Sequence, residues 1–281
     1  MIVVTGATGN VGRSLVRILA DAGEQITATS RSISAADVPE GVRHVPADLA
    51  DADGLRPLFD GADALFLQNG GPSAHLLSPR DILDVAKAGG VSRVVLLSSQ
   101  GVATRPESAS HGDIARGFED AVRESGMEWT ILRPGGFASN SFAWVESVRV
   151  RRAIAAPFAD TGLPVIDPDD IAEVGAAALR EGRHAGQVYE LTGPALSTPR
   201  ERAAAIGEAL GEPIRFVEQT RAEAHAEMVR FMPEPVVETT LNILSEPTPG
   251  ELRISPDVER VLGRAPRPFA DWATRYAAAF R

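Results

Sequence analysis

The feature that most constrains this chain is a set of three glycines near its first residue. Gly6, Gly9 and Gly12 have the spacing G-x-x-G-x-x-G, with a short apolar run before them and a helical pattern after them. In units that bind dinucleotides, the first glycine makes the tight turn, the second leaves room for a pyrophosphate, and the third lets helix and strand pack closely. The alternative is a purely structural turn. We predict a phosphate site with backbone N–H donors, formed by Gly6, Thr8, Gly9, Asn10, Val11 and Gly12.

The rest of the chain alternates between two hydrophobic periods. Short apolar or alternating runs are typical of strands, and apolar residues three and four apart are typical of helices. The expected strands are 2–4, 25–29, 42–45, 64–67, 94–97, 129–132 and 187–191. The expected helices are 11–22, 55–59, 81–88, 111–124, 171–179, 201–210 and 222–231. Strands that alternate with helices imply right-handed crossovers and a parallel sheet.

The expected fold class is therefore α/β: a Rossmann-type doubly wound parallel sheet with a smaller mixed C-terminal lobe. Residues 1–132 carry the regular alternation and form the expected dinucleotide-binding core. Residues 133–281 form mainly the lobe that holds the substrate. The strand at 187–191 is expected to return to the core sheet.

Composition excludes several function classes. The 281 residues carry a net charge of −10, which argues against a nucleic-acid surface; the basic run at 149–152 is too short to change this. No apolar stretch approaches the length of a membrane span, and the first residues do not resemble a signal peptide. The chain has no cysteine, so thiol chemistry is impossible. We expect a cytoplasmic protein, a monomer or homodimer, with a small-molecule substrate and no nucleic-acid or membrane partner.

Several motifs carry a resemblance to a known family. They are Thr5-Gly-Ala-Thr-Gly-x-x-Gly12, Ala47-Asp48-Leu49, Leu96-Leu-Ser-Ser99, Ser125-Gly126 with Thr130-Ile-Leu-Arg-Pro-Gly135, Asp170-Ile-Ala172, and Arg267-Pro-Phe-Ala-Asp-Trp272. With them the chain resembles the NmrA-like group of atypical short-chain dehydrogenases. That group includes quinone reductase-type and triphenylmethane reductase-type enzymes as well as redox-sensing regulators. The resemblance covers nearly the whole chain and implies an NAD(P)H-binding Rossmann fold.

The end of the second expected strand indicates which dinucleotide binds. An acidic residue there would bond the ribose 2′-hydroxyl, but the chain reads Thr29-Ser30-Arg31-Ser32. The planar guanidinium of Arg31 suits a 2′-phosphate, so we expect NADP(H) to be preferred over NAD(H). The alternative is an ordinary exposed arginine.

Two further segments are expected to meet the cofactor. By resemblance, Asp48 and Leu49 lie beside the adenine, although Asp48 could equally cap a helix. Gln68 and Asn69 follow the fourth expected strand, where a doubly wound sheet places its ligand. The alternative for Asn69 is a turn-forming Asn-Gly pair.

The expected catalytic residues are His111, Ser98 and Ser99. By resemblance, short-chain dehydrogenases use a serine after the fifth strand and a Tyr-x-x-x-Lys pair on the next helix. In this chain His111 falls at the tyrosine position and Ala115 at the lysine position. Histidine can act as a general acid near neutral pH, but it could also be a solvent-facing residue. Ser98 is also expected to touch the cofactor. The five histidines show no metal-ligand spacing, so we predict no metal.

The substrate wall is expected from two apolar sets. Phe137, Asn140 and Phe142 follow the sixth strand, and Met228 and Phe231 lie at helical spacing in the lobe. Ordinary core packing is the alternative for both sets. The leading hypothesis is an NADPH-dependent oxidoreductase that transfers hydride to a small aromatic, quinonoid or enone substrate. The other hypotheses are an NADP(H)-sensing regulator without catalysis, and a non-redox isomerase or cyclase on a Rossmann frame.

Overall fold

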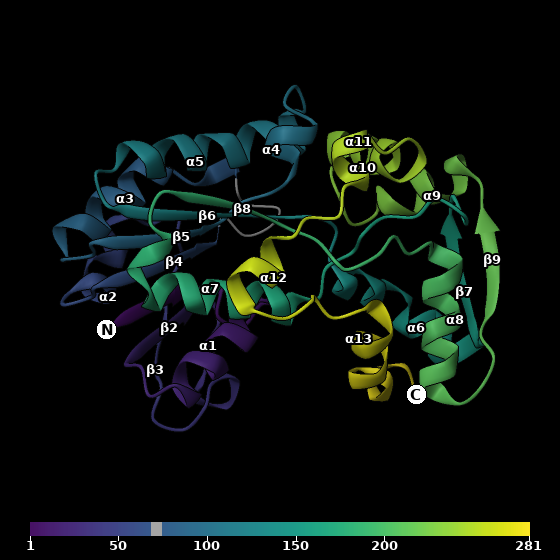
Figure 1. Cartoon of the computed structure of the whole chain (residues 1–281), viewed down its shortest axis with the longest axis horizontal. Coiled ribbons are helices and arrows are strands. Elements are labelled where there is room, and N and C mark those ends of the chain that lie inside the picture. The colour runs from purple at the N-terminus through teal and green to yellow at the C-terminus, as the bar shows by residue number, and fades with distance from the viewer. Residues whose placement is uncertain (69–74) are drawn as a thin grey trace.

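The computed structural model describes residues 1–68 and 75–281. Within them, seven parallel strands form one sheet in the order β3-β2-β1-β4-β5-β6-β8 (Figure 1). The strands are β1 (Ile2–Thr5), β2 (Ile26–Ser30), β3 (Arg43–Pro46), β4 (Ala64–Gln68), β5 (Arg93–Leu97), β6 (Glu128–Pro134) and β8 (Gln187–Leu191). The order reverses between β1 and β4, as a doubly wound sheet requires.

Helices cover both faces of this sheet, because its central strands are apolar on both faces. One face carries α1 (Gly12–Asp21), α7 (Pro168–Arg180) and α12 (Asp257–Leu262). The other face carries α2 (Arg56–Phe59), α3 (Pro79–Ala88) and α5 (Ile114–Glu124). Two separate apolar cores result, one on each side. The sheet therefore leaves only its edges and strand ends open to ligands.

A second part of the molecule lies beside the carboxyl ends of the strands (Figure 1). A two-stranded parallel sheet, β7 (Ala153–Pro157) and β9 (Arg215–Gln219), forms its outer side. Its helices are α6 (Val145–Arg151), α8 (Pro199–Leu210), α9 (Arg221–Met228), α10 (Glu234–Ser245), α11 (Pro249–Leu252) and α13 (Phe269–Arg275). Its core is aromatic: the Trp272 ring packs against Phe142, Phe269, Tyr276 and Phe280. We call this part the C-terminal lobe.

The predicted fold class is confirmed. Each strand and helix expected from the sequence is present, with its ends shifted by only a few residues. The expected helix 222–231 is shorter in the structure: it ends at Met228, and residues 229–231 form a turn. The sequence pattern did not predict two strands, β7 and β9, or the helices α6, α10, α11, α12, α13 and the short α4 (Gly101–Thr104). Within the described residues, no helix combines the length and apolar character needed to cross a membrane.

Candidate active site

The glycine turn lies at the carboxyl end of β1, where the strand order reverses. Gly6 has φ +61°, a left-handed conformation that favours glycine. The N–H of Gly9 donates to the carbonyl of Gly6 at 2.9 Å, which closes the turn. A Cβ on Gly12 would lie 2.2 Å from the Gly6 carbonyl oxygen, so only glycine allows α1 to start this close to the strand. The local backbone therefore has the form that a pyrophosphate site requires.

The side chain of Gln68 lies over this turn from the end of β4. A Cβ on Gly6 would be 2.6 Å from its Oε1, and one on Gly9 would be 3.7 Å from its Nε2. Gln68 Oε1 is buried and has no hydrogen-bond partner among the described residues. An unsatisfied amide oxygen is costly in a protein interior and is commonly found where a ligand completes the bonding. The turn and Gln68 thus fit a dinucleotide.

The loop after β2 presents Arg31 to solvent. Arg31 is exposed and makes no ion pair with any described residue, so its guanidinium remains available. Next to it, the hydroxyl of Thr8 donates to the hydroxyl of Ser30 at 3.2 Å, which joins this loop to the glycine turn. Farther along, Asp48 is exposed and accepts from the N–H of Ala50, and Leu49 packs partly against the core. Asn69 lies outside the described residues.

Ser98 and Ser99 follow β5 and face different surroundings. The Ser98 hydroxyl donates to Glu119 Oε1 at 2.6 Å, on the side covered by α5. Glu119 is fully buried and also accepts from Arg133 and Arg123. Burial alone would raise the pKa of Glu119, but the bonds from Arg133, Ser98 and Arg123 hold it below its usual value. Ser98 therefore belongs to a buried polar network, whereas Ser99 opens onto a cavity.

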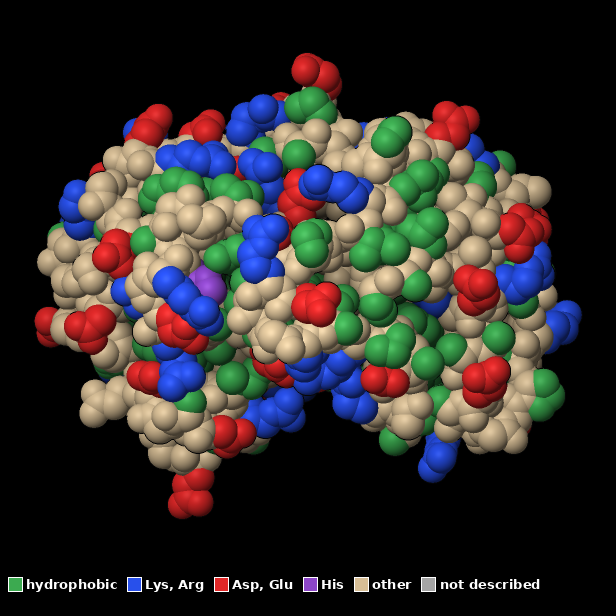
Figure 2. All heavy atoms as spheres, in the orientation of Figure 1, with side chains coloured by type: hydrophobic (Ala, Val, Ile, Leu, Met, Phe, Trp, Pro, Cys, Tyr) green, Lys and Arg blue, Asp and Glu red, His purple; other side chains and the backbone are tan. Residues whose placement is uncertain are grey.

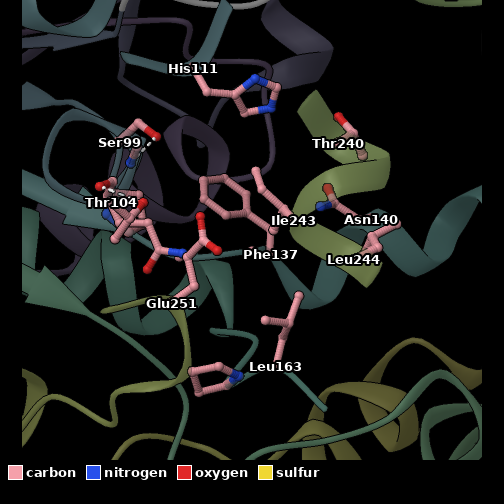
Figure 3. A pocket seen from close by; sticks show the side chains of 16 residues that line it. Ser99, Thr104, His111, Phe137, Asn140, Leu163, Thr240, Ile243, Leu244 and Glu251 are labelled. Carbon is pink, nitrogen blue, oxygen red and sulfur yellow. Dashed lines mark hydrogen bonds between the residues drawn. The ribbon is translucent and has the colours of Figure 1, made fainter. Parts of the chain in front are cut away.

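A cavity of about 370 Å³ lies between the ends of β5 and β6 and the C-terminal lobe (Figure 3). Ser99, His111 and Glu251 supply polar groups to its wall. Its apolar wall comes from both parts of the molecule. Those residues are Pro134, Phe137, Leu163, Pro164, Ile243 and Leu244. Asn140 also lines it, and the adjacent Ser139 accepts from Asn10 of the glycine turn at 3.0 Å. The cavity and the dinucleotide turn therefore share one edge of the sheet.

His111 enters the cavity from a π-helical turn, Ala109–Asp113, just before α5. Single π turns are rare and are frequently found at functional sites. This turn packs directly against Gly101: a Cβ there would lie 2.4 Å from the His111 carbonyl oxygen, so the close contact requires glycine. Burial lowers the pKa of His111 below its ordinary value of 6.5, and Glu251 opposes this shift while Arg105 adds to it. The imidazole is therefore neutral at pH 7.

Glu251 is a site residue that the sequence reading missed. Its side chain is 1% exposed, and both of its oxygens accept from Arg105 at 2.9 Å. The pair joins the segment after α4 (Gly101–Thr104) to α11. The only local signal was Thr248-x-x-Glu251, a capping box that predicts a helix start. That signal could not show that Glu251 would reach the cavity.

The residues expected to hold the substrate separate into three groups. Phe137 and Asn140 line the 370 Å³ cavity. Phe142 lines a different hollow, beside Gly9 and Asn10 of the glycine turn. Met228 packs partly buried within the lobe, and Phe231 is 72% exposed on its surface. Neither Met228 nor Phe231 lines the cavity, so in this structure they are not part of its wall.

One group of side chains outside the cavity has the geometry of a metal site. Among the described residues, His225, Glu234 and Glu238 place possible ligand atoms within 4.8 Å of one another. His225 already lies between the two carboxylates: its Nε2 is 2.7 Å from Glu234 and 3.2 Å from Glu238. Arg221 also pairs with Glu238. An ion-pair network accounts for this cluster, and the absence of a metal stays a prediction.

Comparison with known proteins agrees with this geometry. A family model described as NAD(P)H-binding matches residues 6–182. A (4-alkanoyl-5-oxo-2,5-dihydrofuran-3-yl)methyl phosphate reductase from Streptomyces griseus is 35% identical, over 100% of this chain and 99% of the relative. An NAD(P)H azoreductase from Xenophilus azovorans is 31% identical, also over 100% and 99%. Citrobacter sp. triphenylmethane reductase, solved with NADP(H), has TM-score 0.80 at 22% identity, over 99% of this chain and 100% of that one.

Proposed function

The chain belongs to the NAD(P)H-binding family, within its reductase relatives, and on that premise we propose that it is an NADPH-dependent reductase of small conjugated substrates. The observation that carries the proposal is the cavity of about 370 Å³ at the same sheet edge as the glycine turn. It has room for a small ring system. A redox-sensing regulator has no need of such a cavity, so the enzyme hypothesis is favoured.

The proposed cofactor residues follow the carboxyl ends of three neighbouring strands, β1, β2 and β4, where the strand order reverses. Backbone N–H groups from Asn10 to Gly12 would hold the pyrophosphate, and a donor on the bound dinucleotide would bond the amide oxygen of Gln68. Arg31 would pair with the 2′-phosphate of NADPH. When bound, the nicotinamide supplies hydride, and the protein supplies position and a dry cavity.

The cavity wall favours substrates that accept hydride at an atom conjugated to a carbonyl or to a ring. The Phe137 ring offers a flat apolar surface, and Ile243 and Leu244 add aliphatic contact. Ser99 and His111 offer hydrogen bonds to a carbonyl oxygen. A neutral imidazole can donate such a bond without forming an ion. For hydride delivery to carbon, the proton can then come from solvent, so His111 acts mainly by orienting the substrate.

The charge of the wall narrows the substrate class further. Among the described residues that line the cavity, Glu251 is the only one that carries a charge. The Streptomyces relative acts, by its name, on a phosphate ester with an unsaturated lactone ring. A phosphate would find no unpaired cation on this wall, because Glu251 already pairs with Arg105, so we propose a neutral or cationic conjugated substrate for this chain: an enone, a quinone or a cationic dye.

The test is NADPH oxidation with a matched panel: menadione, an acyl butenolide with and without its phosphate, an azo dye and a triphenylmethane dye. We expect turnover with at least one neutral or cationic acceptor, and lower kcat/KM for the phosphorylated butenolide than for the free alcohol. Gly9→Val serves as the cofactor-binding control. NADPH binding without turnover of any acceptor would instead support the regulator hypothesis. A preference for the phosphate ester would overturn the charge argument.

A further inference from the structure

A second cavity, of about 250 Å³, lies in the C-terminal lobe and contains a buried arginine. Arg202 lies in the first turn of α8 and is 8% exposed. Its Nε donates to the carbonyl of Thr198 at a long 3.4 Å, and its guanidinium carbon lies 5.7 Å from the centre of the Trp144 ring. The terminal nitrogens make no hydrogen bond and no ion pair with any described residue.

An unpaired cation in this position requires a physical explanation. Taking a charge out of water costs several kcal/mol unless a counter-charge and hydrogen bonds offset the loss. Other buried charges of the protein follow that rule, since Glu119 and Glu251 are each bonded by arginine. Burial lowers the pKa of Arg202 to about 10, so the group still carries its charge at neutral pH. The charge therefore has no acidic partner within the described chain, and its contacts there are the Thr198 carbonyl and the Trp144 ring.

The surroundings of Arg202 define what the partner would be. The cavity wall is mostly apolar, from Val165, Ala205 and Phe269, with Leu196 also lining it. Ser197 adds a hydroxyl, and Glu201 lies at the exposed end of the wall. One cation suits one negative charge, and the carboxylate of Glu201 disfavours a dianion. The volume and the wall suit a ligand with a ring or a short chain.

We propose that this cavity binds a small organic carboxylate whose charge pairs with Arg202 and whose apolar group contacts Val165 and Phe269. The guanidinium can donate two parallel hydrogen bonds to a carboxylate. The cavity is separate from the proposed active site, but the two share a wall. Leu163 and Pro164 line the active-site cavity, and the next residue, Val165, lines this one. In this proposal the bound carboxylate is an effector, and it changes substrate binding by shifting residues 163–165.

The primary test is calorimetric titration of benzoate into the full-length protein. We expect benzoate to bind with a Kd of about a millimolar or tighter, and benzyl alcohol, which lacks the charge, to bind at least about tenfold more weakly. Arg202→Met should lose benzoate binding to the same degree. Arg200→Met is the matched control, because Arg200 is on the same turn but pairs with Asp160 at the surface. This control should bind benzoate as the wild type does.

Thermal unfolding separates a ligand site from a packing role. If Arg202 is held for a ligand, Arg202→Met removes an unpaired buried charge, and the melting temperature without benzoate should stay unchanged or rise. If that variant is unstable, Leu196→Glu offers a second test, because it places a carboxylate on the cavity wall while Arg202 remains. It should also abolish benzoate binding.

Three results would overturn the proposal. Unchanged benzoate binding in Arg202→Met would show that benzoate binds outside this cavity. Binding of inorganic phosphate without benzoate would overturn the carboxylate class. If neither benzoate nor hexanoate binds the wild type, the cavity is not a carboxylate site. These binding measurements do not use reductase activity, so their failure is distinct from a failure of the proposed function. Benzoate should also change the KM for the acceptor in the wild type and leave it unchanged in Arg202→Met.

Discussion

The two halves of the candidate active site are built in different ways. At the cofactor end, the shape comes from backbone geometry: the φ of Gly6 and the absence of a Cβ at Gly12. At the substrate end, the shape comes from side chains that converge from distant segments. Glu251 of α11 pairs with Arg105, and Ile243 of α10 lines the same cavity as Phe137. Figure 2 shows the molecule indented between the two parts that contribute these residues.

This difference explains what each half can tolerate. A binding site formed by backbone atoms tolerates few substitutions, because an added side chain fills the space that the ligand needs. A site built from side chains can exchange its wall residues and keep its frame, which suits a family whose relatives reduce unlike molecules. We therefore expect substitutions in the glycine turn to have all-or-none effects, and substitutions of side chains that contact a ligand to have graded effects.

The largest effect is expected from Gly9→Val. A Cβ at this position lies 3.2 Å from the Gly6 carbonyl, which the turn can accommodate with a small shift, so the protein should stay folded. The branched side chain would occupy the space for the pyrophosphate. NADPH affinity, measured by fluorescence titration, should fall more than about a hundredfold. Normal NADPH binding in this variant would show that the cofactor lies elsewhere.

The next effect concerns Glu251→Leu, which leaves Arg105 without its partner. Glu251 is buried, whereas Arg105 can partly regain water, so we expect a loss of about 2–4 kcal/mol in the free energy of unfolding. Denaturant unfolding measures it. Arg80→Leu is the control, because its ion pair with Glu124 is exposed and should contribute less than about 1 kcal/mol. Equal losses in the two variants would mean that burial of the Glu251 pair has no special effect.

Arg31→Ala should have an intermediate effect that depends on the cofactor. Losing a charge-assisted contact to the 2′-phosphate should weaken NADPH binding by about tenfold to a hundredfold, with NADH binding nearly unchanged. Parallel titrations with both cofactors decide this. If both weaken equally, Arg31 does not recognise the 2′-phosphate.

His111→Phe is expected to lower kcat by less than about a hundredfold, below the range typical of general acids. The pKa of His111 is depressed by burial, so the imidazole gains its proton only when the pH falls below 6.5. The wild-type rate should therefore be flat from that value upward, and the variant should keep the same form of pH profile. A drop of a thousandfold or more, with a lost pH limb, would restore His111 as the proton donor.

The smallest effect is expected from Phe231→Ser. Phe231 is exposed and outside the cavity, so unfolding free energy should change by less than about 0.5 kcal/mol and the kinetic constants should stay the same. A raised KM for the acceptor would return Phe231 to the substrate wall, where the sequence pattern first suggested it.

Sequence patterns predicted the fold around the glycine turn better than the shape of the cavity, because the determinants of that fold are local. The glycine spacing and the apolar strands lie within short windows, and the observed strands end within a few residues of those expected. β9 was missed because its residues are largely exposed, so the apolar signal of a strand is weak there. The contact between Glu251 and Arg105 joins residues 146 positions apart, and no local pattern encodes it. The hydroxyl direction of Ser98 likewise depends on the buried Glu119.

The return of β8 to the sheet limits how the molecule can be divided. β8 pairs with β6 in parallel over residues 187–191, although the chain has passed through the C-terminal lobe in between. A fragment that ends at residue 132 would leave β6 as an open edge with unpaired N–H and C=O groups, and it would lack α7, which covers one apolar face. Such an edge invites association with other chains. The nucleotide-binding half is therefore expected to aggregate when it is expressed alone.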